Sequence, residues 1–181
     1  MNVILIGENM NVLIAYHSKP GNSKKVAKSM QEGLLEEGHD VSLEESEKVD
    51  PSTVGSYDFL ILGSGIYAMR IGKPITRLMR KATEVPSQVA CFQTYGNLTW
   101  YPKLFKKNIG KVLKKHGATI VDQFHCCGEN LGMSLEQQQE LWSSFPTEIE
   151  KARAEHYKKI KGRPNAEDLA NAKAWAKNLV Q

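Results

Sequence analysis

Residues 12–23 read Val-Leu-Ile-Ala-Tyr-His-Ser-Lys-Pro-Gly-Asn-Ser, a short apolar run followed at once by small, polar and turn-forming residues. Beyond them, Val26, Ala27, Met30 and Leu34 recur at the spacing of one helix face. This order predicts a strand, a loop and a helix. The same alternation continues along the chain, which favours a sheet covered by helices.

Four more apolar segments have the length and composition of strands. Residues 59–62, Phe-Leu-Ile-Leu, form a continuous apolar run, as is typical of a strand buried on both faces of a parallel sheet. The other strands are predicted at 41–43, 88–92 and 118–124, and helices at 75–82, 104–113, 135–143, 148–160 and 166–179. These elements predict a doubly wound α/β sheet of about five parallel strands with helices on both faces.

The length and composition of the chain limit the classes of protein to which it can belong. It has 181 residues with no Pro/Gly/Ser-rich linker, so we expect one domain over residues 1–181, with 1–9 a short N-terminal extension. No apolar run reaches the ~20 residues of a membrane span, and the N-terminus lacks the pattern of a secretion signal. We therefore expect a cytoplasmic protein. The net charge of +4 is mild and by itself indicates no nucleic-acid partner.

The cysteines and histidines suggest no metal centre. Cys91, Cys126 and Cys127 form neither a disulfide framework nor a C-x-x-C motif. The five histidines do not cluster at metal-ligand spacing, and only His17 borders the first loop.

The loop Ser18–Ser23, called here the phosphate loop, has the composition of an anion site. Loops after parallel strands are where open α/β sheets bind ligands, and a helix N-terminus offers unpaired N–H groups to an anion. Ser18 and Ser23 supply hydroxyls, and Gly21 permits close backbone approach. The simpler alternative is that Asn22 or Ser23 only caps the helix.

This loop resembles the phosphate loop of flavodoxins, roughly [ST]-x-T-G-x-[ST]. Ser18, Gly21, Asn22 and Ser23 match it, whereas Pro20 replaces a hydroxyl residue of the family. The segment 162–169, Gly-Arg-Pro-Asn-Ala-Glu-Asp-Leu, also resembles a stretch common before the last helix of flavodoxin-domain proteins. The resemblance spans residues 10–179. It implies the strand order 2-1-3-4-5 and FMN as cofactor.

Two further loops resemble the segments that flank the flavin ring in this family. They are expected to follow the third and fourth strands, at 63–70 and 93–97. Gly63-x-Gly65-x-x-Ala68 also fits a dinucleotide fingerprint, but no clean helix follows it and no acidic residue ends the next strand. The resemblance therefore implies FMN contacts from Ser64, Gly65, Ile66, Tyr67, Ala68, Thr94, Tyr95, Gly96 and Asn97.

The resemblance implies an electron carrier that shuttles electrons between redox partner proteins. Because the chain is basic and Arg70 is expected near the ring, the reduced, anionic flavin should be less disfavoured than in acidic flavodoxins. The alternative is a flavin-dependent oxidoreductase that acts on a small quinone or a porphyrinogen. Such an enzyme requires a pocket over the flavin and, in the case of a porphyrinogen oxidase, an insertion late in the chain. A cofactor-free interaction or receiver domain is a third interpretation.

Overall fold

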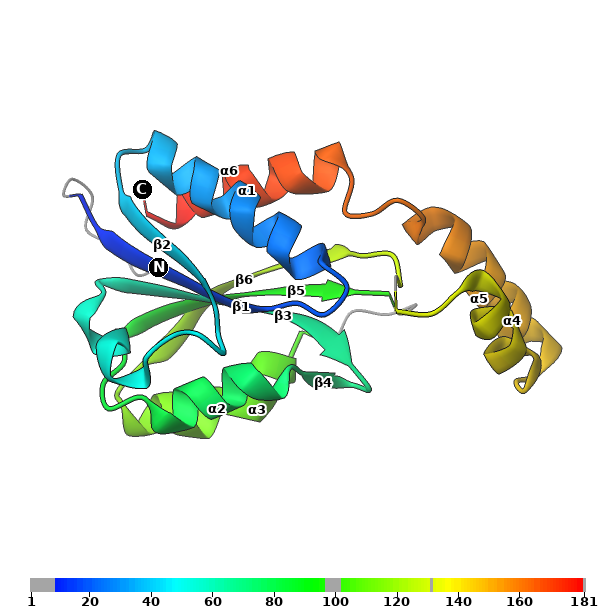
Figure 1. Cartoon of the computed structure of the whole chain (residues 1–181), viewed down its shortest axis with the longest axis horizontal. Coiled ribbons are helices and arrows are strands. Elements are labelled where there is room, and N and C mark those ends of the chain that lie inside the picture. The colour runs from blue at the N-terminus through cyan, green and yellow to red at the C-terminus, as the bar shows by residue number, and fades with distance from the viewer. Residues whose placement is uncertain (1–8, 97–101, 131, 181) are drawn as a thin grey trace.

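The computed structural model of the chain describes residues 9–96, 102–130 and 132–180. Five strands pair in parallel in the order β2-β1-β3-β5-β6 (Figure 1). Their bounds are β1 Asn11–His17, β2 Asp40–Glu45, β3 Phe59–Tyr67, β5 Gln88–Tyr95 and β6 Thr119–Cys127. Numbered along the chain as parallel strands alone, this is the order 2-1-3-4-5, so the fold expected from the sequence is confirmed.

Helices cover both faces of the sheet (Figure 1). On one face lie α1 (Asn22–Glu36) and α6 (Ala166–Leu179), and on the other α2 (Lys73–Lys81) and α3 (Leu104–Lys115). Each pair seals one layer of buried apolar side chains against the strands. A short 3₁₀ helix, η1 (Pro51–Ser56), precedes β3. None of the described helices is long and apolar enough to cross a membrane.

The third strand is longer than predicted. The prediction of a loop at 63–70 is wrong in its first half, because β3 continues to Tyr67 and then turns back as β4 (Arg70–Ile71). Gly63 makes this possible, since a Cβ there would lie 1.9 Å from Cζ of Phe92 on the neighbouring strand. The turn itself is formed by Ala68 and Met69, both with positive φ.

Two helices project beyond the carboxyl end of the sheet (Figure 1). They are α4 (Leu135–Ser143) and α5 (Thr147–Ile160), and together they are called the arm. The arm is closed at its base, where the N–H of Glu129 donates to the carbonyl of Arg163 at 2.8 Å. Neither buried apolar cluster of the sheet includes a residue of the arm.

Candidate functional site

The phosphate loop joins β1 to α1 at the carboxyl edge of the sheet. Gly21 precedes the helix with φ +96°, and no side chain caps the first turn of α1. Two buried polar atoms of the loop, Oγ of Ser18 and Oδ1 of Asn22, have no hydrogen-bond partner within the part of the chain that is described. Unsatisfied buried polar atoms are rare, so their presence beside an uncapped helix start fits an anion-binding loop.

The remaining polar groups of the loop are held in place by distant segments. Oγ of Ser23 and Oγ1 of Thr94 are 2.8 Å apart, which joins the start of α1 to the end of β5. Nδ2 of Asn22 donates to the carbonyl of Glu129 at 2.7 Å. The loop is thus fixed from two sides, as a preorganised binding loop requires.

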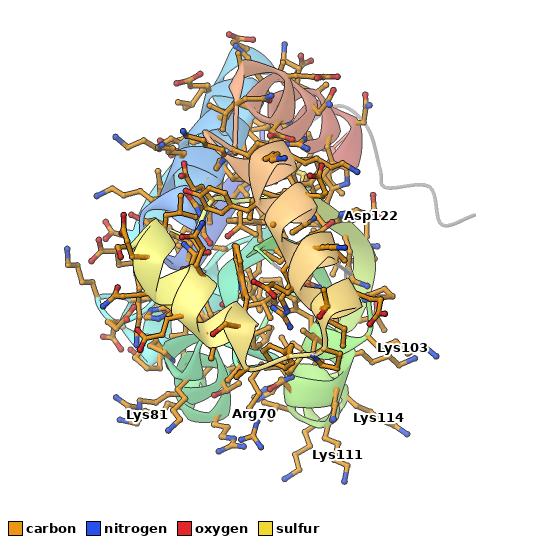
Figure 2. The ribbon with its side chains drawn as sticks, turned by 90° about the vertical axis from the view of Figure 1, so that its right-hand side faces the viewer. Arg70, Lys81, Lys103, Lys111, Lys114 and Asp122 are labelled. Atoms are coloured by element: carbon orange, nitrogen blue, oxygen red, sulfur yellow. The ribbon has the colours of Figure 1, made fainter. Side chains whose placement is uncertain are left out.

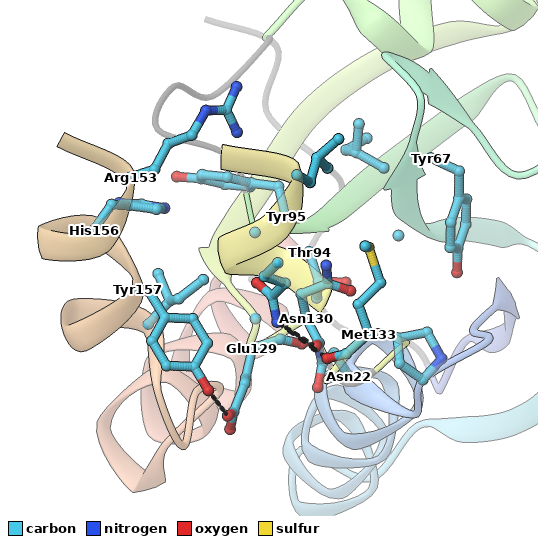
Figure 3. Close-up of a pocket in the computed structure, with 18 of the residues that line it drawn as sticks. Asn22, Tyr67, Thr94, Tyr95, Glu129, Asn130, Met133, Arg153, His156 and Tyr157 are labelled. Carbon is cyan, nitrogen blue, oxygen red and sulfur yellow. Dashed lines mark hydrogen bonds between the residues drawn. The ribbon is translucent and has the colours of Figure 1, made fainter. Parts of the chain in front are cut away.

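A pocket of about 260 Å³ opens next to this loop (Figure 3). Its lining comes from the phosphate loop, the ends of β3 and β5, the segment after β6 and the arm. Its volume lies just below the range of about 300–1,000 Å³ typical of ligand pockets. The sequence-predicted residues that line it are Asn22, Gly65, Ile66, Tyr67, Thr94, Tyr95 and Gly96.

The other predicted site residues lie elsewhere. Ser64 is fully buried, and its Oγ donates to the carbonyl of Gly65 while accepting from the N–H of Gly72, so it braces the β3–β4 turn. Ala68 lines a groove on the far side of Tyr67. Ser18, Gly21 and Ser23 belong to the phosphate loop and do not line the pocket. Asn97 lies outside the described residues.

Arg70 does not line the pocket either. It is exposed, lines the same groove as Ala68 and pairs with Tyr67 across the β3–β4 turn. That Arg70 lies near the flavin ring stays a prediction.

Two aromatic side chains stand at the pocket on different strands. The Tyr67 hydroxyl accepts from the N–H of Lys19 at 3.0 Å, and its ring meets His17 edge-on at 5.5 Å. Burial raises the pKa of Tyr67. Tyr95 lies near His125, with 3.2 Å between its hydroxyl and Nδ1, and burial together with the nearby Cys127 raises the Tyr95 pKa to about 12. Both phenols therefore remain neutral near pH 7.

The arm supplies residues that sequence reasoning missed. Arg153 and His156 line the pocket from α5, with the Arg153 guanidinium 4.7 Å from the centre of the Phe145 ring (Figure 3). Trp142 of α4 packs against Tyr157. The Tyr157 hydroxyl donates to Oε1 of Glu129 at 3.4 Å. The other missed lining residues are Pro20, Gly128, Asn130, Met133, Gln138, Leu141 and Ile160. For the residues of the arm, the sequence signal was the extra helical length after the fifth strand, whereas Pro20 belongs to the phosphate loop already identified.

Comparison with known proteins gives the family. A family model described as a flavodoxin domain matches residues 13–177. The chain belongs to the flavodoxin domain family. Flavodoxin-like proteins as a class bind a flavin and transfer electrons, which agrees with the resemblance that the three loops carry.

Individual relatives are distant. The chain is 26% identical over 173 residues to the uncharacterized protein MJ0298 of Methanocaldococcus jannaschii, covering 95% of this chain and 99% of the relative. Its fold is similar to oxidised flavodoxin 1 of Bacillus cereus (16% identity, TM-score 0.54, 84% and 98% of the two chains). It is also similar to two-electron reduced Megasphaera elsdenii flavodoxin (19% identity, TM-score 0.53, 81% and 98%).

Proposed function

We propose that the protein holds FMN noncovalently in this pocket and carries electrons between redox partner proteins. The observation that supports this most is the pair of unsatisfied buried atoms, Oγ of Ser18 and Oδ1 of Asn22. They lie at a helix start that no side chain caps, beside a pocket lined by three tyrosines. The residues fit the cofactor, because the loop offers donors to a phosphate and the pocket offers apolar and aromatic walls to a flat ring.

Different segments of the chain bind the phosphate and the ring of FMN in this proposal. The phosphate loop holds the phosphate through Ser18 and the first N–H groups of α1, and the Ser23–Thr94 contact keeps that loop against β5. The backbone of Gly65 and Gly96 permits close approach of the ring, and Tyr67 and Tyr95 flank it. FMN, when bound, supplies the redox chemistry. The protein fixes the orientation of the ring and limits its contact with water.

The proposal is tested by comparing FMN with riboflavin, which lacks the phosphate. Protein freed of flavin is titrated with each and the quenching of flavin fluorescence is followed. Several charge-assisted hydrogen bonds to the phosphate should make FMN bind about 100-fold more tightly or better. Ser18→Ala should reduce this ratio, whereas Ser56→Ala, on η1 far from the pocket, should not. Equal affinity for both flavins would overturn the assignment of the phosphate loop.

A second candidate function is favoured by the arm. Arg153, Tyr157 and Trp142 line the pocket from the side opposite to Tyr67, which a carrier that meets only protein partners does not require. A flavin-dependent oxidoreductase acting on a small quinone or a porphyrinogen would use this space for substrate. Turnover of menadione or protoporphyrinogen by the FMN-loaded protein supports the enzyme. Anaerobic reduction in two separate one-electron steps, without turnover, supports the carrier.

A further inference from the structure

The charges of this chain are strongly segregated. Between Ala68 and Ala118 the sequence has eleven lysines and arginines and one acidic residue, Glu84, although the net charge of the whole chain is only +4. The remainder of the chain therefore carries an excess of acidic residues. Such a separation is typical of a surface that recognises an anionic partner.

The fold gathers these cations on one side of the molecule. They belong to β4, α2 and α3, together with Lys103 at the N-cap position of α3, and α2 and α3 pack side by side on the same face of the sheet. Figure 2 shows Arg70, Lys81, Lys111 and Lys114 projecting from this side. The set, called the basic face, consists of Arg70, Lys73, Arg77, Arg80, Lys81, Lys103, Lys106, Lys107, Lys111, Lys114 and Lys115, all of them exposed.

The basic face is not neutralised within the protein. All the ion pairs found among the described residues lie elsewhere, and none includes a member of the basic face. On a helix surface, acidic residues three or four positions away from lysines or arginines commonly form ion pairs with them. The eleven cations are thus available to a partner.

The basic face reaches the candidate flavin site. A groove on this side is lined by Lys19, Arg70, Lys73, Arg77, Arg80 and Lys81, and none of the described residues that line it is acidic. Tyr67 lines both this groove and the pocket, so its ring forms the wall between them. Lys19 lies over that ring, with its Nζ 5.7 Å from the ring centre. A partner bound in the groove would lie one side chain away from the pocket.

The surface chemistry favours an acidic protein over other anions. Strong membrane association needs several apolar side chains beside the cations. Of the large exposed apolar side chains among the described residues, only Met69, next to Arg70, adjoins the basic face. Single-stranded nucleic acid needs aromatic side chains on which bases stack. Among the described residues that line the groove, the aromatic rings are Tyr67 and His17, which already pack against each other edge-on. A folded protein with a carboxylate-rich surface requires neither.

We infer that the basic face is the docking surface for an acidic electron-transfer protein, which it steers to the flavin edge at Tyr67. The inference rests on the proposed function. In the exchange, the reduced partner loses one electron and the flavin of this protein gains it. Electrostatic steering of this kind raises association rates by about 10- to 1,000-fold at low salt.

Stopped-flow electron exchange with two probes of opposite charge tests the inference. The probes are a small acidic [2Fe–2S] ferredoxin as donor and the basic protein cytochrome c as acceptor. The variant is Lys73→Glu/Arg77→Glu, and the matched control is Lys28→Glu/Lys151→Glu, two exposed cations outside the basic face with the same change in net charge. The variant should slow the ferredoxin reaction about tenfold or more at low salt, and the control should change it much less. The cytochrome c rate should not fall in the variant.

A binding measurement separates this inference from the flavin assignment. Labelled ferredoxin is titrated with flavin-free protein and followed by fluorescence anisotropy, so the result does not depend on FMN. Salt-sensitive binding that the variant weakens about tenfold and the control preserves supports the docking surface, even if FMN is not retained. Equal ferredoxin rates and affinities for variant and control would overturn it. Tighter binding of a 20-base-pair DNA duplex, or of anionic lipid vesicles, at 150 mM salt would also overturn it.

Discussion

The hydroxyl of Tyr67 accepts a hydrogen bond from the backbone N–H of Lys19 at 3.0 Å, so the end of β3 is tied directly to the phosphate loop. These residues are distant in the sequence: Tyr67 ends β3, and Lys19 belongs to the phosphate loop. The bond holds the Tyr67 ring at the pocket. It also gives the N–H of Lys19 a hydrogen-bond partner within the protein, which helps to fix the loop before a ligand binds.

Tyr67→Phe keeps the ring and removes this acceptor. A typical hydrogen bond contributes about 0.5–1.5 kcal/mol, so FMN affinity should fall about two- to tenfold as the loop loses its anchor. Fluorescence titration measures the change. Tyr57→Phe, in the apolar layer under α2 and α3, is the matched control and should leave FMN affinity unchanged. An unaltered affinity in Tyr67→Phe would mean that the anchor is irrelevant to binding.

Gly128→Ala should damage both the fold and the site. A Cβ at Gly128 would lie 2.5 Å from Nδ2 and 2.9 Å from Cγ of Asn22, a buried side chain. Asn22 would be displaced and would lose its bond to the carbonyl of Glu129. We expect a loss of about 1–3 kcal/mol in the free energy of unfolding, together with weaker FMN binding.

Gly132→Ala provides the comparison for Gly128→Ala. Its Cβ would come no closer than 3.6 Å to Oδ1 of Asn130, which is ordinary contact. Urea unfolding of both variants measures the difference. If the two substitutions lower the free energy of unfolding equally, the close approach of Gly128 to Asn22 does not explain the loss of stability in Gly128→Ala.

The ion pair between Arg163 and Asp168 should make stability depend on pH in the acid range. Burial by itself raises the pKa of Asp168, but hydrogen bonds from Arg163 and from the N–H of Asn165 outweigh it and hold this pKa below its ordinary value. The pair therefore stabilises the fold above the unfolded-state pKa of about 3.9, and this contribution is lost as the pH falls through the lower, folded-state pKa.

Asp168→Asn should accordingly lower the free energy of unfolding by about 1.5–3 kcal/mol near pH 7, the range for hydrogen bonds to charged groups. The difference from wild type should shrink as the pH falls below about 4. Glu167→Gln, at the exposed neighbouring position, is the control and should cost little at either pH. Denaturant unfolding at several pH values checks both. A loss for Asp168→Asn that is independent of pH would rule out the ionic explanation.

Removal of the arm should leave the sheet intact. Residues 131–161 can be replaced by a short Gly/Ser linker, because the N–H of Gly162 donates to Oε2 of Glu129 at 2.8 Å and the two ends of the arm already meet. Neither apolar layer of the sheet would lose a side chain. We expect cooperative unfolding and retained FMN, with loss of any turnover of menadione. Loss of FMN itself would show that the arm holds the cofactor rather than a substrate.

The strand and helix pattern was readable from the sequence because each element carries its own periodic signal. The runs around Leu13, Ile61 and Ala90 are continuous and apolar, since strands of a parallel sheet are buried on both faces. The phosphate loop could also be predicted from the sequence, because Gly21 and its neighbouring hydroxyl residues belong to one short segment. Such signals do not depend on what the segment later packs against.

Contacts between segments that are distant in the sequence could not be predicted from such local signals. The extension of β3 to Tyr67 depends on the space that Gly63 leaves for Phe92, and the pocket wall formed by Trp142 and Tyr157 depends on where the arm folds back. The sequence by itself determined the α/β order and the family, and it predicted the phosphate loop. Only the tertiary structure decided which face the eleven cations share and what encloses the pocket, because helices far apart in sequence become neighbours through the strand order.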